Sequence, residues 1–203
     1  MKTHKANIVT NVFCILIFIV FVSSCQNNSR KNIERIERQK NSLKDHIGEE
    51  FNLDNILDSN GNLVKLDFTK SEITIVDFWF NECPPCIEEM KQFAEILLGK
   101  EKKITIISIS INRFSLWKST LREHVNKFSF LANNTQNWYH YTLNSREEDK
   151  LKNDVPIINQ IKLQSKYNVT FFPAFFVINK LGIIESRPIS AVRFINQLNV
   201  VGK

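Results

Sequence analysis

One stretch of this 203-residue chain, 73–90, constrains its fold more than any other. The stretch begins with the apolar, largely β-branched run Ile73–Val76, which predicts a buried strand. It continues through Pro84 and Pro85 into a segment that predicts the start of a helix, because proline at the first helical position loses no hydrogen bond. Two cysteines, Cys83 and Cys86, stand between the strand and the body of the helix. The sequence therefore predicts a strand–CxxC–helix unit.

The spacing of the two cysteines indicates the chemistry of this unit. Residues three apart on a helix lie on one turn, so Cys83 and Cys86 can form a disulfide of normal geometry. Cys83 lies at the predicted helix start, where free N–H groups and the helix dipole favour an anion. The thiolate is the nucleophile in disulfide exchange, so Cys83 is the candidate nucleophile and Cys86 the candidate resolving thiol. We expect thiol–disulfide exchange.

The N-terminal residues have the pattern of an export signal. Lys2 and Lys5 precede an apolar run, 12–22, which is too short to span a bilayer comfortably. The run ends in small residues before Cys25, which is similar to the bacterial lipoprotein signal, in which that cysteine becomes diacylated. We expect residues 1–24 to be a signal peptide and Cys25 to tether the mature chain to a membrane in the cell envelope, facing the periplasm. An ordinary signal peptide, or an uncleaved anchor with an incidental Cys25, is the alternative.

The number of cysteines limits what the CxxC pair can do. Of the four cysteines, Cys14 lies in the predicted signal peptide and Cys25 in the predicted lipid anchor. Cys83 and Cys86 then have no other thiol in the chain with which to pair. They must bond to each other, to a metal or to a client protein.

The remaining chain is predicted to be a tether and one domain. Residues 25–45 are polar and charged, which predicts a solvated, partly helical spacer. Residues 46–203 show no internal repeat or linker and are enough for one domain with one core. The net charge of +6 is not concentrated in a basic stripe, so we expect no nucleic-acid partner.

Alternating strands and helices predict an α/β domain. We expect a β-hairpin in 51–68 with its turn at Asn60-Gly61, and helix caps at Ser115 and Ser190. The other predicted elements are the helix 84–98, the strand 104–110, the helices 115–125 and 157–167, the closing hairpin 174–179 and 182–186, and the terminal helix 190–198. Residues 133–153 are polar, aromatic and charged, which predicts a functional insertion or a mobile lid. We expect its aromatic residues to pack in the core or the loop; the alternative is that they face a client protein.

Three segments together resemble the thioredoxin superfamily: Val76–Trp79, the Cys-Pro-Pro-Cys motif at 83–86, and Tyr167–Pro173. The similarity extends over about 49–198 and is greatest to the envelope-bound TlpA/ResA-like branch, within the redoxin (AhpC/TSA-like) group. It implies a thioredoxin-like α/β fold, in which a central mixed sheet is flanked by helices and extended by the N-terminal hairpin and by an insertion before a cis-proline strand. It also implies no cofactor and no bound metal.

Asp77 is the candidate proton acceptor for Cys86. It lies six residues before Cys83 inside an apolar strand, where burial would raise its pKa and allow it to take up a proton. The resemblance implies the same role, because thioredoxins bury an acid at this spacing beneath the CxxC pair. The alternative is that Asp77 ends the strand and faces water.

By the same resemblance, Pro173 is the cis-proline that packs against the CxxC pair and leaves backbone groups free for an extended client. The chain departs from the family pattern here. Phe172 is bulky where small or β-branched residues are usual, and Ala174 replaces a common threonine. These departures leave the client preference and the redox potential open.

The residue before the first cysteine also departs from the pattern, because Glu82 replaces the tryptophan common in thioredoxins. With Glu88 and Glu89 nearby, its negative charge opposes the thiolate at Cys83. A less stable thiolate makes the dithiol form less favoured. The sequence therefore favours a reductant.

We expect a membrane-tethered thiol–disulfide oxidoreductase that acts on disulfide-containing envelope proteins and receives electrons from a membrane donor. One alternative is a copper-carrier-like module. The histidines outside the predicted signal peptide are His46, His124 and His140, and none of them lies at a ligand spacing from the CxxC pair. A peroxidase is another, although Phe80 occupies the position where such enzymes have threonine. The last is a binding protein in which the CxxC pair only staples a turn.

Overall fold

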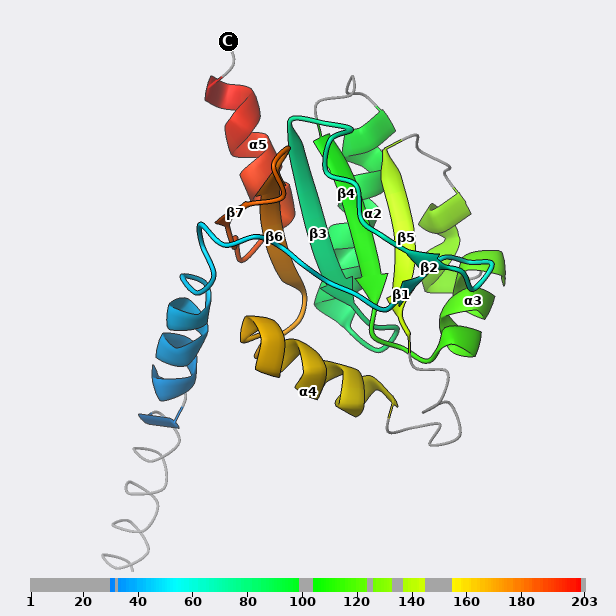
Figure 1. The fold of residues 1–203 in the computed structure, drawn as a ribbon, viewed down its shortest axis with the longest axis horizontal. Coiled ribbons are helices and arrows are strands. Elements are labelled where there is room, and N and C mark those ends of the chain that lie inside the picture. The colour runs from blue at the N-terminus through cyan, green and yellow to red at the C-terminus, as the bar shows by residue number, and fades with distance from the viewer. Residues whose placement is uncertain are drawn as a thin grey trace, which may run out of the picture. The chain divides into compact units, whose positions relative to one another are not determined.

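The computed structural model, drawn in Figure 1, describes residues 30–31, 33–98, 104–123, 126–132, 137–144 and 155–201. The predicted signal peptide and Cys25 lie outside these residues. The chain divides into two compact units, Met1–Asn41 and Ser42–Lys203.

The first unit is helical over the residues described in it, 30–31 and 33–41. Its side chains are mostly exposed, and Arg30 Nε lies 3.2 Å from Glu34 Oε1, one helical turn away. Among all the described residues, no helix has both the length and the apolar character needed to cross a membrane.

In the second unit, beginning at Ser42, the described residues form a mixed sheet of seven strands. The central strands β3, β4 and β5 are parallel, and β6 and β7 extend the sheet antiparallel beyond β3. The strand order is β2-β1-β5-β4-β3-β6-β7. The bounds are β1 Ile56–Leu57, β2 Leu63–Val64, β3 Ile73–Trp79, β4 Ile104–Ser110, β5 Trp138–Leu143, β6 Ala174–Asn179 and β7 Ile184–Ser186. This arrangement confirms the predicted thioredoxin-like α/β fold.

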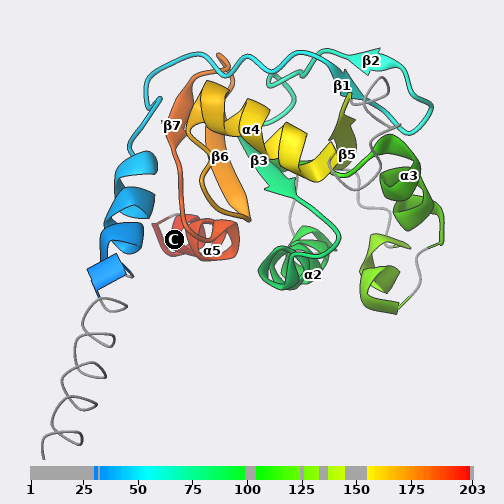
Figure 2. The same cartoon turned by 90° about the horizontal axis from the view of Figure 1, so that it is seen from below.

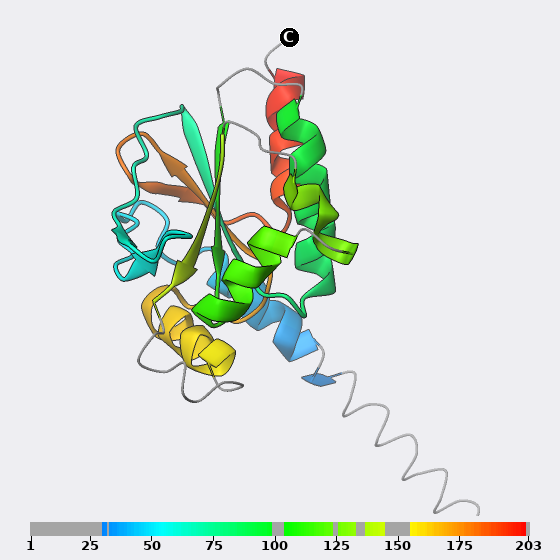
Figure 3. The same cartoon turned by 90° about the vertical axis from the view of Figure 1, so that its right-hand side faces the viewer.

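Helices cover both faces of this sheet. Figures 2 and 3 show α2 (Pro84–Leu98) and α5 (Ala191–Val201) together on one face, with α4 (Val155–Tyr167) on the other. The helix α3 (Phe114–Glu123) and the 3₁₀ helix η1 (Asn126–Ala132) complete the described elements. The sheet is thus covered on both faces, as parallel strands require.

Strand β3 contributes to the core on both faces because successive side chains of a strand point to opposite sides. Ile75 and Trp79 pack into the cluster formed with α2, α5 and η1, whereas Val76 and Phe78 pack into the cluster formed with α4. The same alternation places Asp77 on the α2 side of the sheet.

The predicted N-terminal hairpin is present, and Asp58 explains its turn. Asp58 Oδ1 accepts hydrogen bonds from the backbone N–H groups of Asn60 and Asn62, at 2.9 and 2.8 Å. Gly61 has a φ of 85°, a conformation that glycine adopts without strain. The strand β1 also pairs with β5, so the hairpin extends the main sheet.

The prediction of an insertion or lid over 133–153 is wrong for residues 138–143, which form β5. This strand pairs in parallel with β4, and Trp138 is buried, as the predicted core packing of the aromatic residues requires. Aromatic residues favour strands, but the polar residues on both sides of this short run concealed the strand. The rest of the predicted insertion, 133–136 and 145–153, lies outside the described residues.

The predicted helix caps differ in outcome. Ser190 Oγ accepts a hydrogen bond from Arg193 N at 3.2 Å, so the cap of α5 is confirmed. The cap at Ser115 is wrong, because α3 already begins at Phe114 and the Arg113 carbonyl accepts the bond from Trp117 N at 3.1 Å.

Candidate active site

The site lies where β3 passes into α2. The backbone N–H of Cys83 donates to the Phe80 carbonyl at 3.1 Å, which closes a tight turn after the strand. The Cys83 carbonyl then accepts a hydrogen bond from Ile87 N at 3.1 Å, the first bond of the helix. Cys83 therefore holds the cap position of α2 and Pro84 the first helical position, as the sequence predicts.

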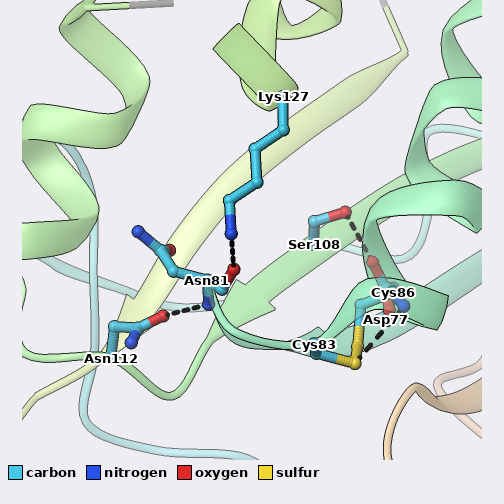
Figure 4. The surroundings of a disulfide bond; sticks show 7 residues. All are labelled: Asp77, Asn81, Cys83, Cys86, Ser108, Asn112 and Lys127. Atoms are coloured by element: carbon cyan, nitrogen blue, oxygen red, sulfur yellow. Dashed lines mark hydrogen bonds between the residues drawn. A yellow bond between two sulfur atoms is a disulfide. The ribbon is translucent and has the colours of Figure 1, made fainter. Parts of the chain in front are cut away.

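Cys83 and Cys86 are joined by a disulfide, with their Cα atoms 5.3 Å apart (Figure 4). Cys86 is fully buried, and Cys83 retains 3% of its accessible surface. The backbone N–H of Cys86 donates to Cys83 Sγ at 3.3 Å. This donor favours negative charge on Cys83 Sγ when the bond is reduced, and Cys83 is the more exposed of the two residues.

Asp77 is buried, as predicted, with 1% of its surface exposed. Its Oδ2 accepts a hydrogen bond from Ser108 Oγ at 3.1 Å, and its Oδ1 has no hydrogen-bond partner among the described residues. Burial raises the pKa of Asp77 to about 8; the Ser108 hydroxyl acts in the opposite direction, and the negative charge of Glu89 adds to the rise. At neutral pH the buried carboxyl group therefore holds a proton for most of the time.

Glu89 shows how Asp77 faces the helix that carries the cysteines. Its charge acts on Asp77 from α2, one turn beyond Cys86. Its Oε2 accepts a hydrogen bond from Val192 N at 3.1 Å, which joins α2 to the start of α5. The alternation of β3 thus places the predicted acid on the face of the sheet that is covered by α2, the helix that carries Cys86.

Asn81, which the sequence analysis missed, anchors the turn before Cys83. Its backbone N–H donates to Asn112 Oδ1 at 2.9 Å, and its side-chain Nδ2 donates to Thr120 Oγ1 at 2.7 Å. Its carbonyl accepts a hydrogen bond from Lys127 Nζ at 2.6 Å (Figure 4). Three separate segments therefore hold this turn. An asparagine in a turn is common, so the sequence carried no signal for this role.

The Phe172–Pro173 peptide bond is cis, as the resemblance implies. Pro173 leads directly into β6, whose first residue, Ala174, pairs with Phe78 at the end of β3 that precedes the cysteines. Phe172 meets Phe80 edge to face, with 5.5 Å between the ring centroids. Both rings are half-buried beside the cluster that contains the disulfide, so they form an aromatic border to the site.

The other predicted residues lie apart from this arrangement or outside it. Glu82 is exposed in the turn, and the lipid-anchor residue Cys25 is outside the described residues. His46 contacts Glu49 at 2.7 Å, His140 lies in β5, and His124 is outside the described residues. Within the described segments, no three side chains of the types His, Cys, Asp or Glu come together as a metal site.

The chain matches the AhpC/TSA family over residues 45–187. It is similar in structure to the thioredoxin domain of a thiol-disulfide oxidoreductase from Bacteroides vulgatus, with a TM-score of 0.53, 22% identity and coverage of 77% of this chain and 98% of that chain. It is also similar to a thiol:disulfide interchange protein from Bacteroides sp., with a TM-score of 0.52, 23% identity and coverage of 78% and 90%. No curated protein matches the chain.

At 22% and 23% identity the two similar structures show the fold alone, whereas the family match shows which family the chain belongs to. More than half of the chain falls within the match, which includes the whole stretch from Asp77 to Pro173. The chain belongs to the AhpC/TSA family and is a thioredoxin-like oxidoreductase.

Proposed function

We propose that this chain is a membrane-tethered thiol–disulfide oxidoreductase that reduces disulfides in envelope proteins through Cys83 and Cys86. The observation that carries the proposal is the placement of the pair. Cys83 caps α2 and its sulfur accepts a backbone hydrogen bond, while Cys86 is buried one turn further into the helix. This arrangement suits a nucleophile and a resolving thiol.

The reaction proceeds in two exchanges. The Cys83 thiolate attacks one sulfur of a client disulfide, which forms a mixed disulfide and releases the other client sulfur as a thiolate. The ionised fraction of Asp77 then takes the proton of the Cys86 thiol, and the Cys86 thiolate attacks Cys83 Sγ. The Cys83–Cys86 bond forms, the mixed disulfide breaks and the client leaves with both sulfurs reduced.

The direction of the reaction follows from the charges beside Cys83. Glu82 and Glu88 are exposed carboxylates on either side of the pair and oppose its thiolate, whereas Lys127 supplies one positive charge at the Asn81 carbonyl. Glu88 is paired with Lys91 at 3.8 Å, so Glu82, directly before Cys83, is the carboxylate that supports the role of a reductant.

The N-terminal sequence supports the proposed location. The signal-like residues 1–24 and the small residues before Cys25 support a lipid-anchored protein of the envelope, facing the periplasm. A reductant in that compartment needs an external supply of electrons, since the periplasm is kept oxidising. We therefore propose a membrane thiol carrier as donor and disulfide-containing envelope proteins as clients, within the TlpA/ResA-like branch.

The first experiment is the redox equilibrium of the purified full-length chain, in detergent, against defined ratios of reduced and oxidised glutathione. A potential near the thioredoxin value of about −270 mV supports a reductant. A potential near about −120 mV would instead make the protein a disulfide donor. With no reversible couple the oxidoreductase proposal fails, and the metal content becomes the measurement that decides for the copper-carrier alternative.

Two variants test the assigned roles of the cysteines. Cys83→Ser should abolish exchange, whereas Cys86→Ser should accumulate a covalent mixed disulfide with the client, visible in a non-reducing gel. Release of the client by Cys86→Ser at the native rate would contradict the resolving role. Turnover of hydrogen peroxide faster than that of a peptide disulfide would favour the peroxidase alternative.

A further inference from the structure

A buried polar row crosses the centre of the sheet beneath the cysteine pair. Asp77 on β3 lies opposite Ser108 on β4, and Ser108 lies opposite His140 on β5. Trp138 Nε1 donates a hydrogen bond to Ser108 Oγ at 2.9 Å, and Ser108 Oγ donates to Asp77 Oδ2 at 3.1 Å. Ser108 is fully buried, and Trp138 retains 7% of its surface.

The indole N–H and the ionised carboxylate together fix the direction of both hydrogen bonds in this row. An indole N–H can only donate, so Trp138 occupies a lone pair of the Ser108 oxygen. While Asp77 is ionised, its Oδ2 can only accept, so the single Ser108 proton is donated to Oδ2. The ionised carboxylate therefore meets an incoming proton with Oδ2 already engaged and Oδ1 open.

Oδ1 is also the atom that is free to exchange a proton. It is buried and has no hydrogen-bond partner among the described residues, and the alternation of β3 places Asp77 on the α2 side of the sheet. Figure 4 shows Ser108 and Asp77 joined by their hydrogen bond. One oxygen of the carboxyl group is thus held by the sheet, and the other is unengaged.

We propose that Trp138 and Ser108 are positioning residues that commit Asp77 Oδ2 to the sheet and leave Oδ1 to take the proton of Cys86 during resolution. This inference rests on the proposed function. In the step concerned, the Cys86 S–H bond breaks, an O–H bond forms at Oδ1, and the sulfur keeps the electron pair with which it attacks Cys83 Sγ.

Other groups around Asp77 also affect its titration, besides Ser108 and Trp138. Glu89 on α2 carries the negative charge that adds to the rise in the Asp77 pKa. Strand β6 presents the apolar Phe175 opposite Asp77, and the titratable neighbour of Ser108 is His140, whose ring lies 4.7 Å from that of Trp138. Glu89 and His140 are unchanged in the variants below, so their effects are common to all of the proteins compared.

The first measurement is the titration of Asp77 in the oxidised full-length protein, followed by its side-chain carboxyl ¹³C shift and assigned with Asp77→Asn. The wild-type midpoint is expected at about 8. Ser108→Ala removes a donor to the charged form and should raise the midpoint by about one pH unit. Trp138→Phe keeps an aromatic ring but not the N–H, and should raise the midpoint by less.

The matched control is Thr74→Val, which removes a buried hydroxyl from β3 that has no partner among the described residues. It should leave the midpoint unchanged. If the midpoint stays at the wild-type value in both Ser108→Ala and Trp138→Phe, the proposed donor chain is overturned. Near-UV circular dichroism establishes that each variant is folded, and Trp138→Phe remains decisive if Ser108→Ala does not fold.

The second measurement is the rate of the Cys86 step. Reduced protein is mixed with dithiobis(nitrobenzoate), which releases one thiol as Cys83 attacks and a second as Cys86 resolves the mixed disulfide. Ser108→Ala should slow the second release about tenfold at pH 7 and move its pH profile upward with the Asp77 titration. Thr74→Val should match the wild type.

The two measurements separate this inference from the proposed function. A titration that moves while the profile of the second release stays fixed means that Asp77 does not take the Cys86 proton, which overturns the inference. If the wild type shows no reversible couple with glutathione, the proposed function fails. The titration then still decides whether Trp138 and Ser108 hold the carboxyl group as described.

Discussion

Replacement of Asp77 by asparagine should stabilise the oxidised protein, by an amount that grows with pH. The folded state holds the Asp77 proton up to a pKa of about 8, whereas the unfolded chain releases it near the ordinary value of 3.8. A raised pKa in the folded state means that stability is fully present below about pH 4 and is lost as the pH rises towards 8. Asparagine does not titrate, so the variant does not lose this stability.

The magnitude follows from the two pKa values. At 1.36 kcal/mol per unit, the difference between pH 7 and 3.8 corresponds to about 4 kcal/mol, and at pH 5 to about 1.6 kcal/mol. Asparagine also matches the protonated wild type in shape: its oxygen can accept from Ser108, and its amide takes the place of a protonated Oδ1 that equally lacks a partner. The pH-independent difference between the two proteins should therefore be small.

The assay is urea unfolding of both proteins at pH 5, 6, 7 and 8 with the disulfide intact. The matched control is Asp67→Asn, because the hydroxyl and backbone N–H of Thr69 lower the pKa of Asp67, so its contribution to stability has the opposite sign. An advantage of Asp77→Asn that stays constant between pH 5 and 8 would refute the assignment of a raised pKa.

Two further substitutions test the surroundings of Cys83. Lys127→Met removes the cation that donates to the Asn81 carbonyl, so the Cys83 thiolate loses a favourable charge and the redox potential against glutathione should become more negative by roughly 10–30 mV. Lys127→Arg keeps the charge and should keep the native potential. An equal shift in both variants would contradict the charge effect. Phe172→Thr removes one ring of the border formed with Phe80. The rate of exchange with a small peptide disulfide, measured by stopped-flow fluorescence, should rise about threefold while the stability of the sheet stays unchanged. An unchanged rate would mean that the ring does not limit access.

The parts of the fold that depend on local patterns were predictable from the sequence. The apolar run of β3, the proline at the start of α2 and the turn at Asp58 each carry their own physical signal within a few residues. The same was true of the cysteine pair and of the burial of Asp77, because a carboxylate between apolar neighbours in a strand has little access to water.

Contacts that depend on the register between distant strands were not predictable. Ser108 reaches Asp77 across 31 residues, and Trp138 reaches Ser108 across 30. The role of Trp138 was hidden further because its strand was not recognised within a polar segment. The three bonds to Asn81 come from separate parts of the chain, and a single turn residue gives no sign of them in the sequence.

The raised pKa of Asp77 accounts for the presence of a buried carboxyl group that lowers stability at neutral pH. A free cysteine thiol has a pKa of about 8.5, so proton transfer from such a thiol to an acid of pKa about 8 costs only about 0.7 kcal/mol. Transfer to a carboxylate with the ordinary value of 3.8 would cost about 6 kcal/mol. Burial thus brings the transfer from the Cys86 thiol to ionised Asp77 close to balance, although only the ionised minority of Asp77 can accept the proton at neutral pH. Under the proposed mechanism, the same desolvation that destabilises the fold raises the basicity of Asp77, and a variant that gains stability at this position should lose speed in the Cys86 step.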